Sequence, residues 1–268
     1  MINVPLLRHT LRTHRLPVAL IALALGVWGF LMPVIYATFG VQMEALLTSG
    51  IIPEAFLRLL GADPFSLRGA VALGSVHPIA LGLQLIYPVG FAAIAIAGER
   101  QRGTLEVTLA RPLSRQTLYL TLLAACFGFV GVAIACLLTG GAAGATFSGV
   151  IAEIDLWRMP TLWLNGVLLF GAFAAIGLAA SVTFDRVAPA LGWTLGIGLV
   201  MYVLEVLGSL WPDAEFLQPY SLFHYLQAKA ILTGQTHRID LAVLAGIIGA
   251  AVLWALVVFP RRDLAAPS

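Results

Sequence analysis

The sequence predicts an all-α membrane protein with six transmembrane helices, both termini in the cytoplasm, and short interfacial and coupling helices. Its composition is the first observation: 60% of the residues are hydrophobic and only 10% are charged, whereas soluble globular domains carry roughly 25% charged residues. The second is a series of six long apolar runs separated by polar segments. The net charge of +2 is too small to indicate nucleic-acid binding, which requires clustered basic residues.

Each apolar run is long enough to cross a bilayer, which takes about 20 helical residues. The runs cover residues 17–37, 78–98, 117–140, 162–182, 187–210 and 241–259. The first run is longer than the apolar core of a signal peptide and lacks a small-residue cleavage site, so we expect it to remain as a span. No linker or strong internal repeat divides the chain, and we expect one transmembrane domain over residues 1–268.

Basic residues predict the orientation. If both termini lie inside, ten of the 15 Lys and Arg residues fall in cytoplasmic segments and five fall outside. Cytoplasmic loops of membrane proteins carry such an excess. The distribution therefore places the termini, and the segment that follows the second run, on the cytoplasmic side.

The segment before the first span has an amphipathic pattern. Arg8, Arg12 and Arg15 fall near one helical face, and Leu7 and Leu11 fall on another. A helix of this kind lies along a membrane surface. We therefore expect an interfacial helix at the inner leaflet, with ordinary interfacial packing as the alternative.

Two outer segments also contain patterned stretches. Residues 53–60, within an outer segment of about 38–76, have the pattern of a short amphipathic helix. Residues 220–226 are rich in aromatic side chains, which suit the headgroup level of a membrane.

Several catalytic motifs are missing from the sequence. It has no G-x-x-x-x-G-K-[ST] phosphate loop, and its only lysine, Lys229, falls in a predicted outer segment. The histidines have no H-E-x-x-H spacing, and no G-x-S-x-G elbow occurs. We therefore expect no metal site, no cofactor and no enzymatic activity in this chain, so any ATP hydrolysis would belong to a separate subunit.

A dense charged segment follows the second span. Six ionisable residues fall in it: Glu99, Arg100, Arg102, Glu106, Arg111 and Arg115. Leu105 and Leu109 are four residues apart and would share one face of a short helix, while Arg102 and Glu106 could form an ion pair at the same spacing.

Residues around this segment mark its bends. Gly103 permits a turn, Pro112 should end the short helix, and Ser114 could cap the third span. Two interpretations stay open on residue chemistry alone. The segment is either a surface helix that a soluble partner contacts or a solvated turn whose charges only set the topology.

Three stretches resemble the type-2 ABC transporter permeases, which are the transmembrane subunits of ABC exporters. The family's second-helix exit and coupling segment are similar to three runs of this chain: Gly98-Glu99-Arg100, Gly103-Thr104-Leu105-Glu106 and the following Arg111-Pro112-Leu113-Ser114-Arg115. The ending Phe259-Pro260-Arg261-Arg262-Asp263-Leu264 is similar to the basic C-terminal ending common in that group. The resemblance covers essentially the whole chain.

The resemblance implies a permease dimer, presumed homodimeric, bound to two cytoplasmic ABC ATPase subunits that carry ATP and Mg. The helix containing Arg8, Arg12 and Arg15 would flank the coupling segment. The ATPase contact itself would be made by residues of that segment: Glu99, Arg100, Arg102, Gly103, Thr104, Leu105 and Glu106. The expected location is the bacterial cytoplasmic (inner) membrane, and the expected cargo is a drug-like small molecule or a lipid.

A few polar residues lie within the predicted spans. Glu205 is the only acid well inside one, where a charge costs ~2.5–3.5 kcal/mol. It could face a dimer interface, a cavity or the outer surface. Gln84 and Asn165 are either hydrogen-bond partners between helices or cargo ligands.

Small residues and prolines shape the spans. Gly192 and Gly196 form a G-x-x-x-G motif that permits close helix approach. The resemblance suggests a contact between permeases through the first and fifth spans, and internal packing is the alternative. Pro88 with Gly90 is the best hinge candidate, because both residues lie in the span that leads directly to Glu99. Pro33 and Pro189 indicate static kinks in their helices.

Three functions remain open at this point. The first is an ATP-driven export permease. The second is an ion-gradient-driven secondary transporter with Glu205 as its proton site. The third is a membrane scaffold or enzyme with no transport role.

Overall fold

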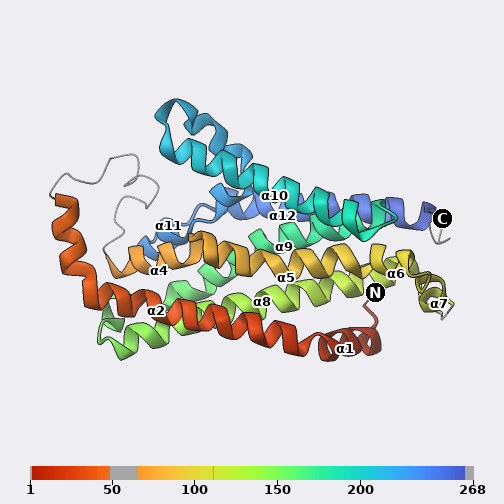
Figure 1. Ribbon diagram of the computed structural model, residues 1–268, viewed down its shortest axis with the longest axis horizontal. Helices are drawn as coiled ribbons and strands as arrows, with labels where there is room; N and C mark the ends of the chain where they lie inside the picture. The colour runs from red at the N-terminus through yellow and green to blue at the C-terminus, as the bar shows by residue number, and fades with distance from the viewer. Residues whose placement is uncertain (1, 49–65, 111, 263–268) are drawn as a thin grey trace.

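The computed structural model describes residues 2–48, 66–110 and 112–262, and these residues form helices and turns without a strand. The longer helices lie nearly parallel (Figure 1). The α-helices are α1 (Val4–Thr13), α2 (Arg15–Thr48), α4 (Leu67–Val76), α5 (Pro78–Ala95), α6 (Ala97–Gln101), α7 (Leu105–Leu109), α8 (Arg115–Phe147), α9 (Met159–Thr183), α10 (Val187–Leu210), α11 (Ala228–Thr233) and α12 (Arg238–Val258). The 3-10 helices are η1 (Ile151–Glu153), η2 (Leu156–Arg158), η3 (Pro212–Tyr220), η4 (Leu222–Tyr225) and η5 (Phe259–Arg261).

Six helical segments are long and apolar enough to cross a membrane, which confirms the predicted all-α fold with six transmembrane helices. They are Arg15–Gly40, Pro78–Ala95, Arg115–Phe147, Leu156–Thr183, Val187–Leu210 and Arg238–Arg261. The second segment ends at Ala95 rather than at residue 98, because the backbone breaks before α6.

The outer end of the molecule differs from the sequence expectation. Helix α2 continues to Thr48, and α4 adds a helix whose residues Leu67 and Val71 are buried. Residues 38–76 are therefore not simply an outer loop, and the helix predicted at 53–60 lies outside the described residues. Phe223 was expected at headgroup level, but it is buried against Phe173, with ring centroids 5.2 Å apart.

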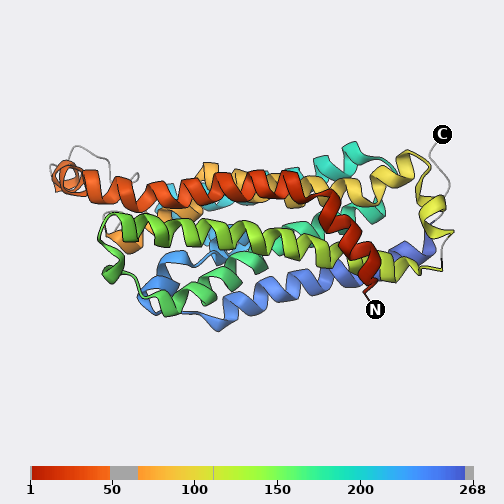
Figure 2. The same ribbon diagram turned by 90° about the horizontal axis from the view of Figure 1, so that it is seen from below.

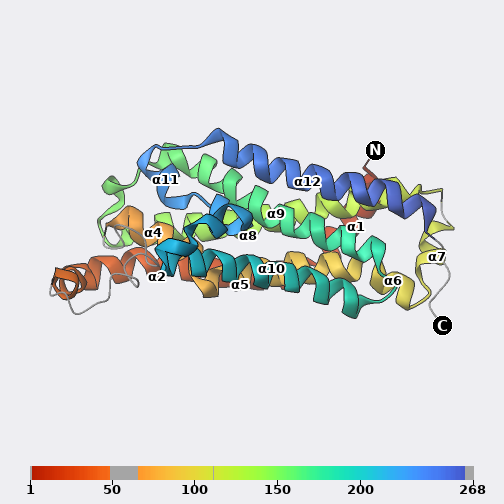
Figure 3. The same cartoon turned by 90° about the horizontal axis from the view of Figure 1, so that it is seen from above.

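Helix α9 is the central element of the bundle. It contacts α5, α8, α10 and α12, and Figure 3 shows it between α12 and the pair formed by α5 and α10. Its buried positions include many small residues, such as Ala172, Ala175 and Ala179. Small side chains let neighbouring helices approach closely, which compensates for the weak hydrophobic driving force between helices in lipid.

Helices α2 and α8 pack backbone to backbone through glycines. A Cβ atom at Gly29 would overlap the carbonyl oxygen of Leu137, and one at Gly140 would overlap that of Gly26. Gly144 has the same relation to Phe30. Figure 2 shows the two helices side by side along most of their length. This contact is the closest kind that helices can make, and no side chain fits within it.

The three prolines have different environments. Pro33 and Pro88 lie inside α2 and α5, where each removes a backbone hydrogen bond. Pro189 lies in the first turn of α10, so the static kink expected there is wrong. The N–H groups of a first turn have no partner within the helix, and proline costs little at such a position.

Both described ends of the chain lie at one end of the bundle. Helix α1 and η5 flank α6 and α7 there, and the turn that joins α9 to α10 lies nearby (Figures 1 and 3). Helices α10, α5 and α2 form one long face, onto which Figure 1 looks. Leu199 of α10 and Leu23 of α2 are strongly exposed.

The glycine contact generates a stability prediction. Gly140→Leu should lower the free energy of unfolding by ~3 kcal/mol or more, because the new side chain meets the α2 backbone and no rotamer avoids it. Thermal unfolding in detergent measures the change. Gly249→Leu on α12 is the matched control, since a Cβ atom there has no neighbour within 4 Å. Equal unfolding temperatures for the two variants would contradict the packing described.

Candidate functional site

The coupling segment, residues 99–106, begins at a break between α5 and α6. Two backbone N–H groups at this break, those of Ile96 and Ala97, donate to Ser181 Oγ at 3.1 and 2.8 Å. The Ser181 hydroxyl in turn donates to the Ala93 carbonyl at 2.9 Å. A buried side chain of α9 thus satisfies the backbone groups that the break frees, as burial away from water requires.

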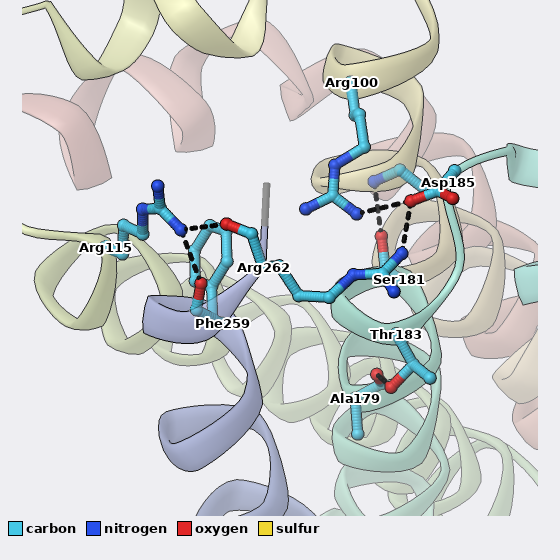
Figure 4. A network of polar contacts seen from close by, with 9 residues as sticks. Arg100, Arg115, Ala179, Ser181, Thr183, Asp185, Phe259 and Arg262 are labelled. Atoms are coloured by element: carbon cyan, nitrogen blue, oxygen red, sulfur yellow. Dashed lines mark hydrogen bonds and ion pairs between the residues drawn. The ribbon is translucent and has the colours of Figure 1, made fainter. Parts of the chain in front are cut away.

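Two arginines meet one carboxylate next to this break. Arg100 Nη1 lies 3.1 Å from Asp185 Oδ1, and Arg262 Nη2 contacts the same oxygen. Figure 4 shows the two side chains converging on Asp185 from α6 and from the end of the chain's last helix. Asp185 lies in the turn between α9 and α10, so the network connects three parts of the bundle.

Arg100 is unusual in its burial. Its side chain is 0% exposed, and its Nε and Nη2 atoms have no hydrogen-bond partner among the described residues. Desolvation, followed by the positive charge of Arg262, lowers the pKa of Arg100, and Asp185 opposes both effects. An arginine nevertheless stays protonated in proteins. Among the described residues, Asp185 is therefore the carboxylate that pairs with this buried positive charge.

The segment then turns sharply at Gly103, where φ is +71°. Glu99 accepts hydrogen bonds from Arg102 and from Thr104, whose Oγ1 lies 2.6 Å from Glu99 Oε2. The ion pair expected between Arg102 and Glu106 is not formed, because α6 ends at Gln101 and α7 begins at Leu105. The turn separates the two residues, and Arg102 pairs with Glu99 instead.

Helix α7 presents a small protruding surface. Leu105 is 1% exposed and anchors the helix in the core, with Leu109 half-buried beside it. Glu106 is exposed, and Val107 is 70% exposed. An apolar side chain that protrudes beside an acid, at the tip of the bundle, offers a contact to another protein.

The base of the segment is attached to α10. Gln101 Oε1 accepts a hydrogen bond of 3.0 Å from the Val187 N–H at the start of α10. Together with Ser181 and Asp185, this bond connects α6 to both sides of the α9–α10 turn. Displacement of α6 therefore acts on the first turn of α10.

The third span carries a further connection. Ser114 caps α8 as predicted, accepting from the Thr117 N–H at 3.1 Å. Arg115 donates to the carbonyl oxygens of Phe259, at 2.8 Å, and Arg262. The start of α8 is thereby tied to the end of α12.

The segment predicted to form an interfacial helix is helical, as α1. Arg8, Arg12 and Arg15 are exposed on it and on the start of α2. Asn3 caps α1, and its N–H donates to Thr121 Oγ1 of α8 at 3.0 Å. His14, at the junction with α2, packs edge-on against Phe91 with ring centroids 4.9 Å apart. Desolvation lowers the pKa of His14.

Glu205 lies near the outer end of α10 and faces η3. Its Oε1 atom is 3.5 Å from Gln218 Nε2, which also donates to Ser209 at 3.1 Å. Its Oε2 atom is buried without a hydrogen-bond partner among the described residues. Glu205 thus lies against η3, near the end of α10 that is farthest from α6.

Gln84 and Asn165 form internal hydrogen bonds. Gln84 Nε2 donates to the Ala80 carbonyl at 3.1 Å and lies 3.4 Å from the Ser75 carbonyl of α4. Asn165 donates to the Tyr225 carbonyl at 2.8 Å and accepts from the Gln227 N–H at 3.1 Å. Both amides connect spans to neighbouring segments, and both are buried.

Gly192 and Gly196 are open to the outside of the chain. A Cβ atom at either position would have no neighbour within 4 Å. They line a hollow of about 410 Å³ on α10, beside Trp193 and Tyr220. Internal packing, one of the two alternatives, does not occur at these glycines.

A second hollow lies between α5 and α10 on the same face. It measures about 420 Å³, and Leu81, Gly82, Leu85, Leu199 and Tyr202 are among its lining residues. Its walls are mainly apolar, as in most small-molecule sites.

Sequence analysis missed Ser181, Asp185 and Gln101. A serine in a helix and an acid in a short turn are common, so neither residue type signals its partner. The one available signal was Asp185 itself, an acid beside Arg186 at the end of a predicted span, with unpaired arginines elsewhere at the same membrane surface.

Comparison with protein-family models gives a match over residues 8–264, and the matching model is described as "ABC-2 family transporter protein". A comparison with curated proteins gives no match.

The shared carboxylate generates a second stability prediction. Asp185→Asn should lower the free energy of unfolding by about 3 kcal/mol, since it leaves the buried Arg100 without a compensating charge. Denaturant titration in detergent measures the loss. Asp155→Asn is the control, because its pair with Arg158 is on the surface and contributes about 1 kcal/mol at most. A loss of that same small size for Asp185→Asn would show that Arg100 does not depend on it.

Proposed function

Since this chain belongs to the ABC-2 family of transporter proteins, we propose that it is the permease subunit of an ATP-driven exporter. The family and the six membrane-length helices make it a multi-pass membrane transporter subunit. In the proposal, ATP and Mg bind to separate cytoplasmic ABC ATPase subunits, and a second permease copy completes the assembly. The proposed location is the bacterial inner membrane.

One observation carries the proposal: α7 protrudes directly after α6, and α6 is bonded to the start of α10. Glu106 and Val107 offer the ATPase a contact surface. Asp185, Ser181 and Gln101 connect the adjoining α6 to the turn before α10. A push on α7 would thus reach α10 through short polar contacts, and a change of state in the ATPase would change the position of α10.

The open face supports export of an apolar cargo between two copies. The hollow between α5 and α10 would change shape when the first turn of α10 moves. Its mainly apolar walls favour a drug-like small molecule or a lipid as cargo. States with different cargo affinity are what an ATP-driven cycle requires.

The ion-gradient alternative has less support. Glu205 faces η3 at the outer end of α10 and shares Gln218 with Ser209. A proton site for a secondary transporter would be expected near the bilayer midplane, between discontinuous helices.

The first functional prediction concerns the α7 surface. Val107→Asp and Glu106→Ala should each reduce permease-stimulated ATP hydrolysis by roughly tenfold, as a loss of about 1.4 kcal/mol of contact energy produces. Gly103→Leu should do the same, because a side chain is strained at a φ of +71°. The ATPase for the assay is the one that copurifies, and a neighbouring reading frame with a phosphate loop would identify it.

The control for these variants is Gln116→Arg, an exposed residue in the first turn of α8. It should leave both copurification and ATP hydrolysis unchanged. Normal stimulation by Val107→Asp and Glu106→Ala would contradict the proposed role of α7.

The second functional prediction concerns the partner copy. Gly196→Trp should weaken self-association by roughly tenfold or more, because the new ring fills the hollow on α10 that a second copy would enter. Counting of subunits per particle in bilayers measures it. Gly246→Trp on α12 is the matched control, since its Cβ position is equally free of neighbours. If both variants remain as dimeric as the original chain, α10 is not the interface.

A further inference from the structure

A cavity of about 560 Å³ lies beside the coupling segment, and it shares no lining residue with the two hollows on α10 described above. Its walls come from α1, α5, α8 and the α6–α7 segment, all within one chain. None of the contacts that connect α6 to α10 passes through it. The cavity therefore requires a separate explanation.

The cavity has two chemically different ends. Its deep end is lined by buried apolar side chains, including Phe91, Leu118 and Leu122. Its other end is lined by polar groups, including His9, Arg102 and Thr108. A site with an apolar depth and a polar mouth matches a molecule with an apolar tail and a polar head.

The deep end adjoins the lipid-facing surface of α5. Ile86 is 62% exposed and Ile94 is 45% exposed, and both line the cavity. Between them, Gly90 leaves space: a Cβ atom there would have no neighbour within 4 Å. A hydrocarbon chain could thus enter sideways from the bilayer.

The polar end is bordered by α1, a basic helix whose arginines do not themselves line the cavity. Helix α1 contributes Arg8 and Arg12, and it contains no acid. Arg15 follows at the start of α2 and is exposed. Glu99 also lines the mouth, but Arg102 and Thr104 already donate to its carboxylate. Basic residues on a surface helix attract anionic lipid headgroups.

We propose that this cavity binds one acyl chain of an anionic membrane phospholipid, whose headgroup lies at the mouth beside His9 and Arg102. We place this lipid in the cytoplasmic leaflet because the proposed function puts this end of the bundle in the cytoplasm. The binding of the lipid does not depend on that orientation. The bound lipid would contact α1 and α7 at once, and would stabilise α7 from the side opposite its exposed surface.

The size of the cavity argues against a helix of a second copy as its occupant. A helix is about 10 Å across, so 560 Å³ would take little more than about one turn of it. The same volume falls in the ordinary range for a bound small molecule, roughly 300–1,000 Å³. A flexible, narrow chain fits this shape better than a helix does.

The first experiment maps the lipid on the unaltered chain. The protein is placed in phosphatidylcholine vesicles with a small share of phosphatidylglycerol that carries a photoactivatable group in its acyl chain. Crosslinks should concentrate on the peptides that contain Ile86, Gly90 and Leu122. An even distribution over the exposed faces of α2, α10 and α12 would overturn the proposal, whatever any variant does.

The second experiment fills the cavity. Gly90→Leu should reduce labelling of those peptides by at least about tenfold, because its side chain occupies space that the acyl chain needs. Gly82→Leu is the matched control: it lies on the same helix with an equally free Cβ position, but it faces the hollow between α5 and α10. Equal labelling of the two variants would overturn the proposal.

The third experiment tests the headgroup. His9→Glu places a negative charge at the mouth and should weaken labelling by phosphatidylglycerol about fivefold, without affecting a phosphatidylcholine probe. Val4→Glu adds the same charge to an exposed position of α1 that does not line the cavity, and it should change neither. If both probes label the original chain equally, the anionic headgroup is wrong.

None of these experiments needs an ATPase. A result that overturns lipid binding can therefore be distinguished from a result that overturns the proposed export function. Counting of copies per particle, done on the same samples, identifies the remaining occupant. A loss of self-association in Gly90→Leu but not in Gly82→Leu would assign the cavity to a second copy and overturn the lipid.

Discussion

The backbone break between α5 and α6 is the constraint on which this end of the bundle depends. An N–H group left without a partner in a membrane costs several kcal/mol, and two such groups meet at the break. Ser181 accepts from both, so the break is stable only when α9 lies against it. That position also brings Asp185 to Arg100 and brings Val187, at the start of α10, to Gln101. Two further contacts thus accompany the bonds of one buried hydroxyl.

Helix α10 is held by hydrogen bonds at its two ends. Its first turn is bonded to α6, and its outer end packs under η3 through Gln218 and Ser209. Between these points it is largely exposed, with Gly192 and Gly196 free of neighbours. Helices α2 and α8, in contrast, are joined along their backbones. The structure therefore combines a pair of spans joined along their backbones with a span, α10, that packs against α9 and α5 on one side and leaves the rest of its surface exposed.

The sequence was sufficient for the features that depend on composition and local pattern. Six apolar runs predict six helices, since a bilayer core requires that length, and Ser114 predicts a cap because its role needs only the next three residues. Contacts between residues that are far apart in the sequence could not be predicted from it. Arg102 was matched with Glu106 by helical spacing, but a turn at Gly103 intervenes and Glu99 is nearer. The α2–α8 contact was missed because glycines in apolar helices are frequent, and only the packed structure distinguishes Gly140, which meets a backbone, from Gly249, which meets nothing.

The separation of Arg100 and Asp185 has a consequence for synthesis. The two residues are 85 positions apart, so the arginine leaves the ribosome two spans before its carboxylate. During that interval its charge cannot enter the hydrocarbon, where it would be unpaired, and it must remain in water at the membrane surface. The loop after the second span is therefore completed late, when the fourth helix inserts and supplies the acid. Truncated chains that stop before residue 185 would retain an unfinished, protease-accessible loop at this end.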